Sequence, residues 1–310
     1  MAGVKFGWNV PTASPEYVTG EVHVERILNA LGDVHKSFDS VWVYDHLHAP
    51  PFFDADDYPR LEAWTTTAYL ARAFPNLYFG NMVLGQSYRN PALLAKMAAT
   101  LQALTGGKVI LAIGAGWMES EYHAYGFDFP KASVRIAQLE ETVQIIRLMW
   151  TEKLATFDGE YYQVKDALCE PKPNPVPPIM IGGNGEQLTL RVVARYADWW
   201  NGVGLNAERM AHKLDVLRSH CEHEGRDYEE IVKTYIGIIS IAETEDEAKR
   251  IASASPRRNS MDFVGTPTQV IKQMQPYVDL GVSHFMLDFS DFPKSTGARL
   301  FVDEVMPAFG

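Results

Sequence analysis

A carboxylate next to a histidine at the end of an apolar run is the first candidate for chemistry in this sequence. Asp45 and His46 follow the β-branched and aromatic residues 40–44. A carboxylate can orient a neighbouring imidazole, and an imidazole titrates near neutral pH. The pair is therefore expected to transfer a proton, although a polar loop histidine would explain the same residues. His48 adds a second imidazole, but no third clear ligand follows, and we expect no metal.

Glycine-rich segments close two other apolar runs. Gly114–Trp117 follows residues 109–113, and Gly182, Gly183, Asn184 and Gly185 follow residues 179–181. Small residues that open a helix can aim amide N–H groups at a phosphate without any basic side chain, although a tight turn needs the same residues. No Gly-Lys-Ser/Thr follows, which excludes a Walker loop. A third segment, residues 81–87, turns from apolar to polar.

The elements that must position these segments alternate along the chain. Apolar runs of strand length are separated by stretches with helical spacing. Strands are predicted at 4–10, 40–44, 77–84, 109–113, 179–181, 198–201, 232–241 and 282–289. Helices are predicted at 16–31, 61–74, 92–104, 134–150, 187–196 and 207–224, and from 244 and 266 onward, with a hairpin at 155–164 that turns at Asp158-Gly159.

Eight strands, each followed by a helix, predict an α/β fold, namely a (β/α)8 TIM barrel formed by residues 1–310 as a single domain. An open doubly wound sheet is the alternative, but no GxGxxG follows the first predicted strand. In a barrel the carboxyl ends of the strands carry the functional site, so the segments above are expected at that face. Trp117, Trp199 and Trp200 are interpreted as core or wall residues.

Composition excludes several classes of protein. The 310 residues are 46% hydrophobic and 22% charged, values typical of a globular enzyme or small-molecule binder. A net charge of −11 argues against nucleic acid as a partner. The sequence shows no signal peptide and no membrane span, and Cys169 and Cys221 form no CxxC motif, so we expect a cytoplasmic protein.

Read in order, several motifs resemble the luciferase-like monooxygenase superfamily, in the branch that uses the deazaflavin coenzyme F420. The resemblance covers nearly the whole chain. It rests on SVWVYDHLH, SYRNPALLAKMAATLQALTGGKVILAIGAGW, EYHAYGFDFP, TFDGEYYQVKDALCEPKP, PIMIGGNGEQLTLRVVARYADWWN and VGTPTQVIKQMQPYVDLGVSHFMLDF. It implies a (β/α)8 barrel with an insertion after strand seven, and residues 254–264 look like part of that insertion.

The resemblance also implies roles for individual residues. Asp45 and His46 match a pair beside the reactive end of the deazaflavin ring, with His46 as proton donor or acceptor. A non-prolyl cis peptide, forming a bulge behind the ring, would fall at Asn81-Met82 or Met82-Val83. The remaining residues implied in cofactor binding are Gly85, Ala115, Gly116 and Trp117 around the ring and side chain, and Gly182, Gly183, Asn184 and Gly185 at the phosphate.

The predicted function is hydride transfer between coenzyme F420 and an unidentified small organic molecule. A monooxygenase that uses flavin mononucleotide (FMN) and oxygen is the alternative, and a non-catalytic cofactor-binding protein is a third reading. The sugar-phosphate dehydrogenase branch has an acidic residue where this chain has Trp117 and a tryptophan where it has Pro50, so sugar-phosphate oxidation is not expected.

The substrate pocket is expected between residues 47–60 and 254–264, where Phe52, Phe53 and Trp8 suggest an apolar guest. The cofactor is a polyanion, so its binding to this acidic chain must depend on local amides and on cations such as Arg89. A homodimer is a further expectation from the family.

Overall fold

The computed structural model describes residues 3–13, 16, 18–49 and 59–310. The chain divides into two compact units, each made of separate stretches of sequence. The first contains Met1–Leu77, Asn201–His212 and Val232–Gly310, and the second contains Tyr78–Trp200 and Lys213–Ile231. The single domain stays a prediction, and each unit is described by itself.

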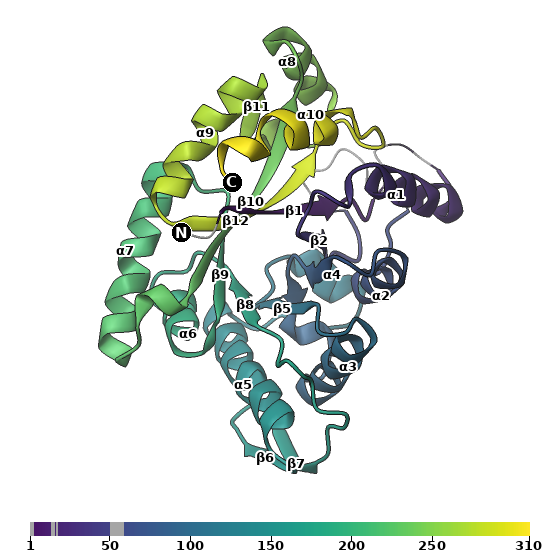
Figure 1. The fold of residues 1–310 in the computed structure, drawn as a ribbon. Coiled ribbons are helices and arrows are strands. Elements are labelled where there is room, and N and C mark those ends of the chain that lie inside the picture. Colours follow the sequence, from purple (N-terminus) through teal and green to yellow (C-terminus); the bar gives the residue numbers. More distant parts are fainter. Residues whose placement is uncertain (1–2, 14–15, 17, 50–58) are drawn as a thin grey trace. The chain divides into compact units, whose positions relative to one another are not determined.

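The first unit is a parallel sheet with helices packed on it (Figure 1). Its strands run in the order β11-β10-β12-β1-β2, and every adjacent pair is parallel. The strands are β1 (Lys5–Val10), β2 (Ser40–Val43), β10 (Val232–Ile241), β11 (Phe263–Gly265) and β12 (Val282–Phe289). The helices are α1 (Gly20–Val34), α2 (Ala63–Ala73), α8 (Glu245–Ala254), α9 (Pro267–Asp279) and α10 (Thr296–Glu304), with 3-10 turns η3 (Arg258–Ser260) and η4 (Met306–Ala308).

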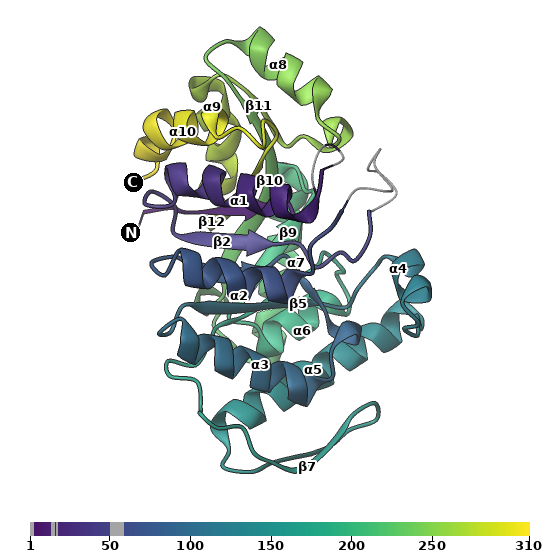
Figure 2. The same cartoon turned by 90° about the vertical axis from the view of Figure 1, so that its right-hand side faces the viewer.

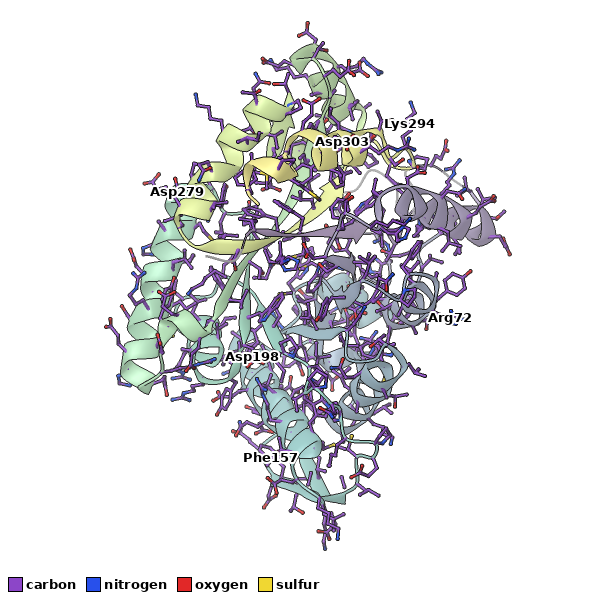
Figure 3. All side chains as sticks on the ribbon, viewed as in Figure 1. Arg72, Phe157, Asp198, Asp279, Lys294 and Asp303 are labelled. Atoms are coloured by element: carbon purple, nitrogen blue, oxygen red, sulfur yellow. The ribbon has the colours of Figure 1, made fainter. Side chains whose placement is uncertain are left out.

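Strand alternation separates two faces of this sheet. Phe6 on β1 packs on the helix side, with its ring centroid 5.2 Å from that of Phe301 in α10. Gly7 points the other way, because a Cβ built on it would lie 2.4 Å from Oγ of Ser40. On β1 the helix-covered face therefore contacts an aromatic ring, whereas the opposite face packs closely on Ser40 and on the Trp42 indole. The outer surface of this unit carries charges, among them the exposed Asp279 and Asp303 on helices and Lys294 in the loop before α10 (Figure 3).

The second unit holds a shorter parallel sheet and a separate hairpin. Its strands are β3 (Tyr78–Asn81), β4 (Leu84–Gly85), β5 (Val109–Gly114), β8 (Ile179–Gly182) and the hairpin strands β6 (Ala155–Asp158) and β7 (Gln163–Ala167). Both β3 and β4 pair with β5, which pairs with β8 on its other side. Strand β9 (Trp199–Val203) and helix α7 (Ala207–Glu224) contain two of the four points where the chain passes between the units.

The helices of the second unit cover its sheet, and α3 and α5 lie side by side (Figure 2). They are α3 (Pro91–Leu104), α4 (Glu119–Ala124), α5 (Ala132–Thr151) and α6 (Thr189–Tyr196), with the 3-10 turns η1 (Gln86–Tyr88) and η2 (Tyr228–Glu230). Asn90 begins α3 by accepting hydrogen bonds from the amides of Ala92 and Leu93, and Pro91 occupies the first turn, where its missing N–H is harmless.

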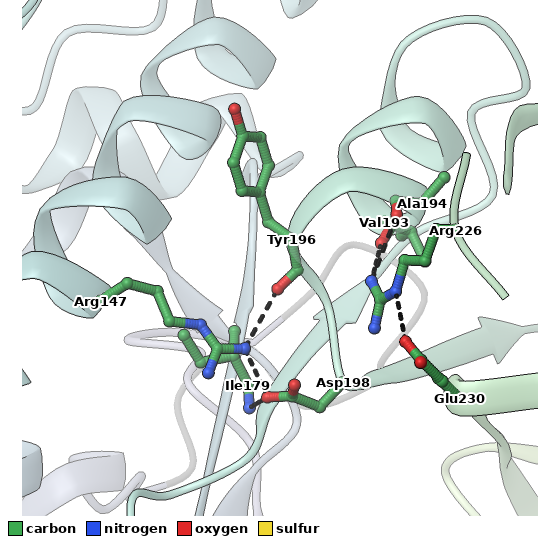
Figure 4. A network of polar contacts seen from close by, with 8 residues as sticks. All are labelled: Arg147, Ile179, Val193, Ala194, Tyr196, Asp198, Arg226 and Glu230. Atoms are coloured by element: carbon green, nitrogen blue, oxygen red, sulfur yellow. Dashed lines mark hydrogen bonds and ion pairs between the residues drawn. The ribbon is translucent and has the colours of Figure 1, made fainter. Parts of the chain in front are cut away.

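An ion pair joins the amino ends of β8 and β9 to helix α5 (Figure 4). Asp198 accepts hydrogen bonds from the Arg147 guanidinium at 2.6 Å and from the Ile179 amide at 2.7 Å. Arg147 also donates to the Tyr196 carbonyl at the end of α6. This network lies at the strand ends opposite to the glycine-rich segments, so its role is in stability.

Most predicted elements are confirmed within a few residues, and β10 and β12 have the predicted bounds. The predicted start of helix α1 and the predicted turn of the hairpin were wrong. Helix α1 begins at Gly20 instead of Glu16, because the Thr19 side chain caps it by accepting from the Val22 amide. The β6–β7 hairpin does not turn at Asp158-Gly159, since Asp158 pairs with Gln163 and the turn is longer. The carboxylate of Glu141 in α5 holds that turn through the amides of residues 160–162.

Two α-helices and one strand were not predicted, namely α4, α10 and β11. The insertion after the seventh barrel strand, β10, comprises α8, η3 and β11, so it is longer than residues 254–264. In the part of the chain that the structure describes, no helix is long and apolar enough to cross a membrane.

Candidate active site

Asp45 and His46 directly follow β2 in the first unit. The structure buries Asp45, which is only 5% exposed, and leaves His46 partly accessible. A buried carboxylate beside an accessible imidazole is an arrangement suited to proton transfer, because the ring can reach a bound molecule while the carboxylate stays fixed. The catalytic role of this pair stays a prediction.

A buried cluster that the sequence did not reveal lies next to this pair. Tyr44, the residue before Asp45, receives a hydrogen bond of 2.7 Å from the Arg257 guanidinium, whose central carbon lies 4.5 Å from the centroid of the Tyr44 ring. Arg257 also pairs with Asp288 on β12 at 2.8 Å, and the two side chains are 14% and 7% exposed. Burial raises the pKa of the Asp288 carboxyl, and the Arg257 charge opposes that rise.

A second carboxylate, partly buried, anchors the insertion that carries Arg257. Asp262 accepts hydrogen bonds from the Tyr235 hydroxyl at 2.7 Å and from the Ile238 amide at 2.8 Å, both on β10. Burial raises the pKa of this carboxyl as well. The sequence contains little indication of this cluster, because Arg257, Asp262 and Asp288 are widely spaced and form no motif.

The second unit contains the predicted bulge. Gly80 pairs with Ile110 and Leu84 with Ile113, so the β3–β4 side has one more residue than β5 between these pairs. The peptide bond between Met82 and Val83 is cis, which confirms one of the two predicted positions. Asn81 and Met82 are buried, and Val83 is partly exposed.

Val83 lies against two of the predicted glycines. A Cβ built on Gly114, at the end of β5, would lie 2.8 Å from a Val83 methyl, and one built on Gly182, at the end of β8, would lie 2.9 Å from the other. Contacts this short are not tolerated, so both positions need glycine while Val83 occupies the bulge. The bulge and the Gly182 loop are therefore adjacent.

The Gly182–Gly185 loop precedes a helix, as expected, but does not form its first turn. Gly182 is still in β8, and α6 begins only at Thr189, because a turn at residues 186–188 intervenes. The prediction of helix-opening amides at these glycines was wrong in that respect. Trp200 donates its indole N–H to the Gly183 carbonyl at 2.9 Å, and His220 of α7 contacts the Glu186 carbonyl at 2.7 Å, so the loop is fixed at two points.

The other predicted cofactor residues lie after β4 and β5. Gly85 ends β4 against the Tyr88 ring, and Gly116 has a φ of 75° in the left-handed region that favours glycine. Ala115 and Asn184 are partly exposed, and Trp117 is 53% exposed. Of the two interpretations of Trp117, the core position is therefore wrong, and the wall position stays a prediction. Trp200 is completely buried, as predicted.

The predicted substrate wall is only partly described. Trp8 is fully buried between Phe38 and Phe289, with ring centroids 5.9 Å and 5.6 Å away, so its assignment to the pocket was wrong. Pro50, Phe52 and Phe53 lie outside the described residues. Among the described residues no group of three His, Cys, Asp or Glu side chains could hold a metal ion.

Comparison with known proteins identifies the family. The sequence pattern of the luciferase-like monooxygenase family matches residues 4–263, so the chain belongs to this family. An F420-dependent glucose-6-phosphate dehydrogenase of Kineococcus radiotolerans is 28% identical, over 88% of this chain and 89% of its own. A phthiodiolone/phenolphthiodiolone dimycocerosates ketoreductase of Mycobacterium tuberculosis is 31% identical, over 73% of this chain and 64% of its own.

Solved structures agree on the fold. An F420-dependent secondary alcohol dehydrogenase, in complex with an F420-acetone adduct, has a TM-score of 0.83 at 20% identity and covers 99% of both chains. A long-chain alkane monooxygenase has a TM-score of 0.82 at 14% identity and covers 99% of this chain and 91% of its own. The predicted fold class, a luciferase-like (β/α)8 barrel, is confirmed.

Proposed function

We propose that the chain is an F420-dependent oxidoreductase that interconverts a small alcohol and its ketone or aldehyde, with His46 moving the proton. The proposal is supported by relatives named for coenzyme F420 and by an accessible histidine next to a buried carboxylate at the end of β2. The latter observation carries the assignment of the proton to His46.

Residues of the second unit fit part of such a cofactor. The Val83 side chain, with Gly114 and Gly182 against its methyl groups, offers an apolar surface for a flat ring. The partly exposed loop Gly182–Gly185, held by Trp200, offers main-chain amides to a phosphate. We propose that these residues, with Asn81, Met82, Gly85, Ala115, Gly116, Trp117 and Asn184, hold the deazaflavin.

Oxidation of an alcohol removes a hydride and a proton, and we assign these to the cofactor and to His46, respectively. When bound, the deazaflavin supplies a two-electron centre that takes up or donates a hydride. His46 accepts the hydroxyl proton as the alcohol is oxidised and returns it as the carbonyl compound is reduced. Asp45 keeps the imidazole oriented for both directions.

The substrate class is proposed from the relatives. The named relatives include dehydrogenases of an alcohol and of a sugar phosphate and a ketoreductase, all of which act on an alcohol or a carbonyl carbon. The family resemblance implies that Trp117 stands where the sugar-phosphate dehydrogenase branch has an acidic residue. An uncharged alcohol or ketone is therefore preferred to glucose 6-phosphate as the first compound to test.

The alternative function is that of an FMN-dependent monooxygenase, since monooxygenases share the fold. Fluorescence titration with coenzyme F420 and with FMN separates the two. Tight binding of FMN but not of F420, together with oxygen consumption in the presence of reduced FMN, would contradict the proposal.

His46→Ala tests the catalytic assignment. We expect its kcat to fall by about 100-fold, the typical contribution of a general acid or base, while the Kd for F420 changes little. His48→Ala is a matched control from the same loop, with a partly exposed ring whose Nδ1 lies 3.1 Å from the Ala49 carbonyl oxygen. An unchanged kcat in His46→Ala would remove His46 from the mechanism.

Two further properties belong to the proposal. We expect a homodimer in the cytoplasm that binds neither nucleic acid nor membrane. Analytical ultracentrifugation tests the dimer, and a monomer at micromolar concentration would contradict it.

A further inference from the structure

The insertion after β10 carries one arginine into the buried end of the first unit's sheet. Arg257 lies three residues beyond α8, and its backbone amide is held by the Ser255 hydroxyl at 3.1 Å. Its guanidinium reaches Asp288 on β12 and Tyr44 at the end of β2. One side chain therefore joins three segments that lie far apart in the sequence.

The contacts define a single geometry for the Tyr44 side chain. The guanidinium donates to the phenol oxygen and lies over the ring, and it also pairs with Asp288. A planar guanidinium has fixed donor directions, so these contacts leave the Tyr44 side chain less freedom than an apolar contact would. The other end of the insertion is fixed as well, because Asp262 binds Tyr235 and the Ile238 amide.

The desolvation free energy of this buried ion pair indicates that Arg257 does more than hold the insertion in place. A buried ion pair contributes little net stability compared with apolar residues of similar volume, because both charges lose their hydration. Asp45 and His46 follow Tyr44 directly in the chain. Fixing the Tyr44 ring and hydroxyl therefore fixes the point from which these two residues depart.

We propose that Arg257 is a positioning residue for His46, acting through Tyr44 and Asp288. The inference rests on the proposed function for its kinetic part. Arg257 itself contacts Tyr44 and Asp288, and its role is to set the orientation of the imidazole. An error of about 1 Å in such an orientation can lower a rate by about 100-fold.

The test compares Arg257→Gln, Arg257→Lys and Tyr44→Phe with Arg258→Gln. Arg258 is the exposed neighbour in the same insertion, so its substitution removes the same charge. Three quantities are measured, namely kcat and KM for the reduced or oxidised substrate, and the NMR signal of the His46 ring in cofactor-free protein. The signal is assigned from its absence in His46→Ala, and the exposed His123 provides an internal reference.

We expect Arg257→Gln to lower kcat by about 10- to 100-fold with KM changed by less than about threefold, and to shift the His46 signal but not that of His123. Arg257→Lys should recover part of kcat, and Arg258→Gln should resemble the unmodified protein. The double variant Arg257→Gln/Tyr44→Phe should lose no more than Arg257→Gln alone, because both changes break the same contact.

Specific results would overturn the inference. An unchanged His46 signal in folded Arg257→Gln is such a result, whether or not kcat falls. If Arg257→Gln does not fold, Tyr44→Phe decides, because it removes only the hydroxyl oxygen, and an unchanged His46 signal there overturns the inference. If the unmodified protein binds no F420, the proposed function fails, whereas the cofactor-free NMR measurement still decides the positioning role.

Discussion

A buried histidine in the first unit makes a stability prediction with a definite sign. Nε2 of His284 on β12 lies 2.8 Å from the Ser40 hydroxyl, which also accepts a hydrogen bond from the Trp42 indole N–H at 2.8 Å. The Ser40 proton is thus available to the lone pair of a neutral imidazole. Burial lowers the pKa of His284 from 6.5 to about 4.

The direction of the pH effect follows from this depressed pKa. Between about pH 4 and pH 6.5 the unfolded chain binds a proton at this position and the folded chain does not. Stability is therefore fully present above pH 6.5 and is lost progressively as the pH falls toward 4. With these two pKa values, the loss attributable to His284 between pH 7 and pH 5 is about 2 kcal/mol.

Urea unfolding at pH 7 and pH 5 measures this contribution. His284→Gln keeps a side-chain oxygen that can accept from Ser40 but cannot titrate. Its free energy of unfolding should fall by about 2 kcal/mol less than that of the unmodified protein over the same interval. His123→Gln, at an exposed position, should leave the pH dependence unchanged. Equal falls in the unmodified protein and in His284→Gln would refute the reasoning.

The remaining predictions concern the second unit and one helix start. Gly114→Ala should destabilise the protein by about 1–3 kcal/mol, because its Cβ meets Val83, and adding Val83→Ala should recover part of that loss in urea unfolding. No recovery would contradict the contact. Asp198→Ala removes the acceptor that Arg147 shares with the Ile179 amide, and leaves Arg147 with the Tyr196 carbonyl. It should lower the thermal midpoint, with about 1–3 kcal/mol lost, and an unchanged midpoint would show that water replaces the carboxylate. Thr266→Ala removes the capping box of α9 and should cost about 1 kcal/mol in urea unfolding, whereas no loss would mean the box is not needed.

Local signals determined most of the elements. Residues 232–241 and 282–289 are long runs in which apolar residues predominate, and both are strands with those bounds, because a strand buried on both faces favours apolar residues at most of its positions. Buried polar side chains such as Lys233, His284 and Asp288 are the exceptions. Asn90-Pro91 and Thr266-Pro267 marked helix starts through capping chemistry that depends on neighbouring residues alone. The prediction of an element was wrong where a residue far away in the sequence determines the local conformation. The β6–β7 turn is held by Glu141 of α5, and the pattern of residues 155–164 does not indicate this contact.

By itself the sequence determined the alternation of strands and helices, the family, and the candidates Asp45, His46 and Gly182–Gly185, because these depend on residue type and order. Only the tertiary structure decided what surrounds them. It placed Val83 against Gly114 and Gly182, and it removed Trp8 from the substrate wall by packing it between Phe38 and Phe289. It also brought Arg257 onto Tyr44 across 213 positions. The physical reason is that burial and ion pairing depend on distances set by the packing of whole elements, and spacing along the chain does not encode those distances.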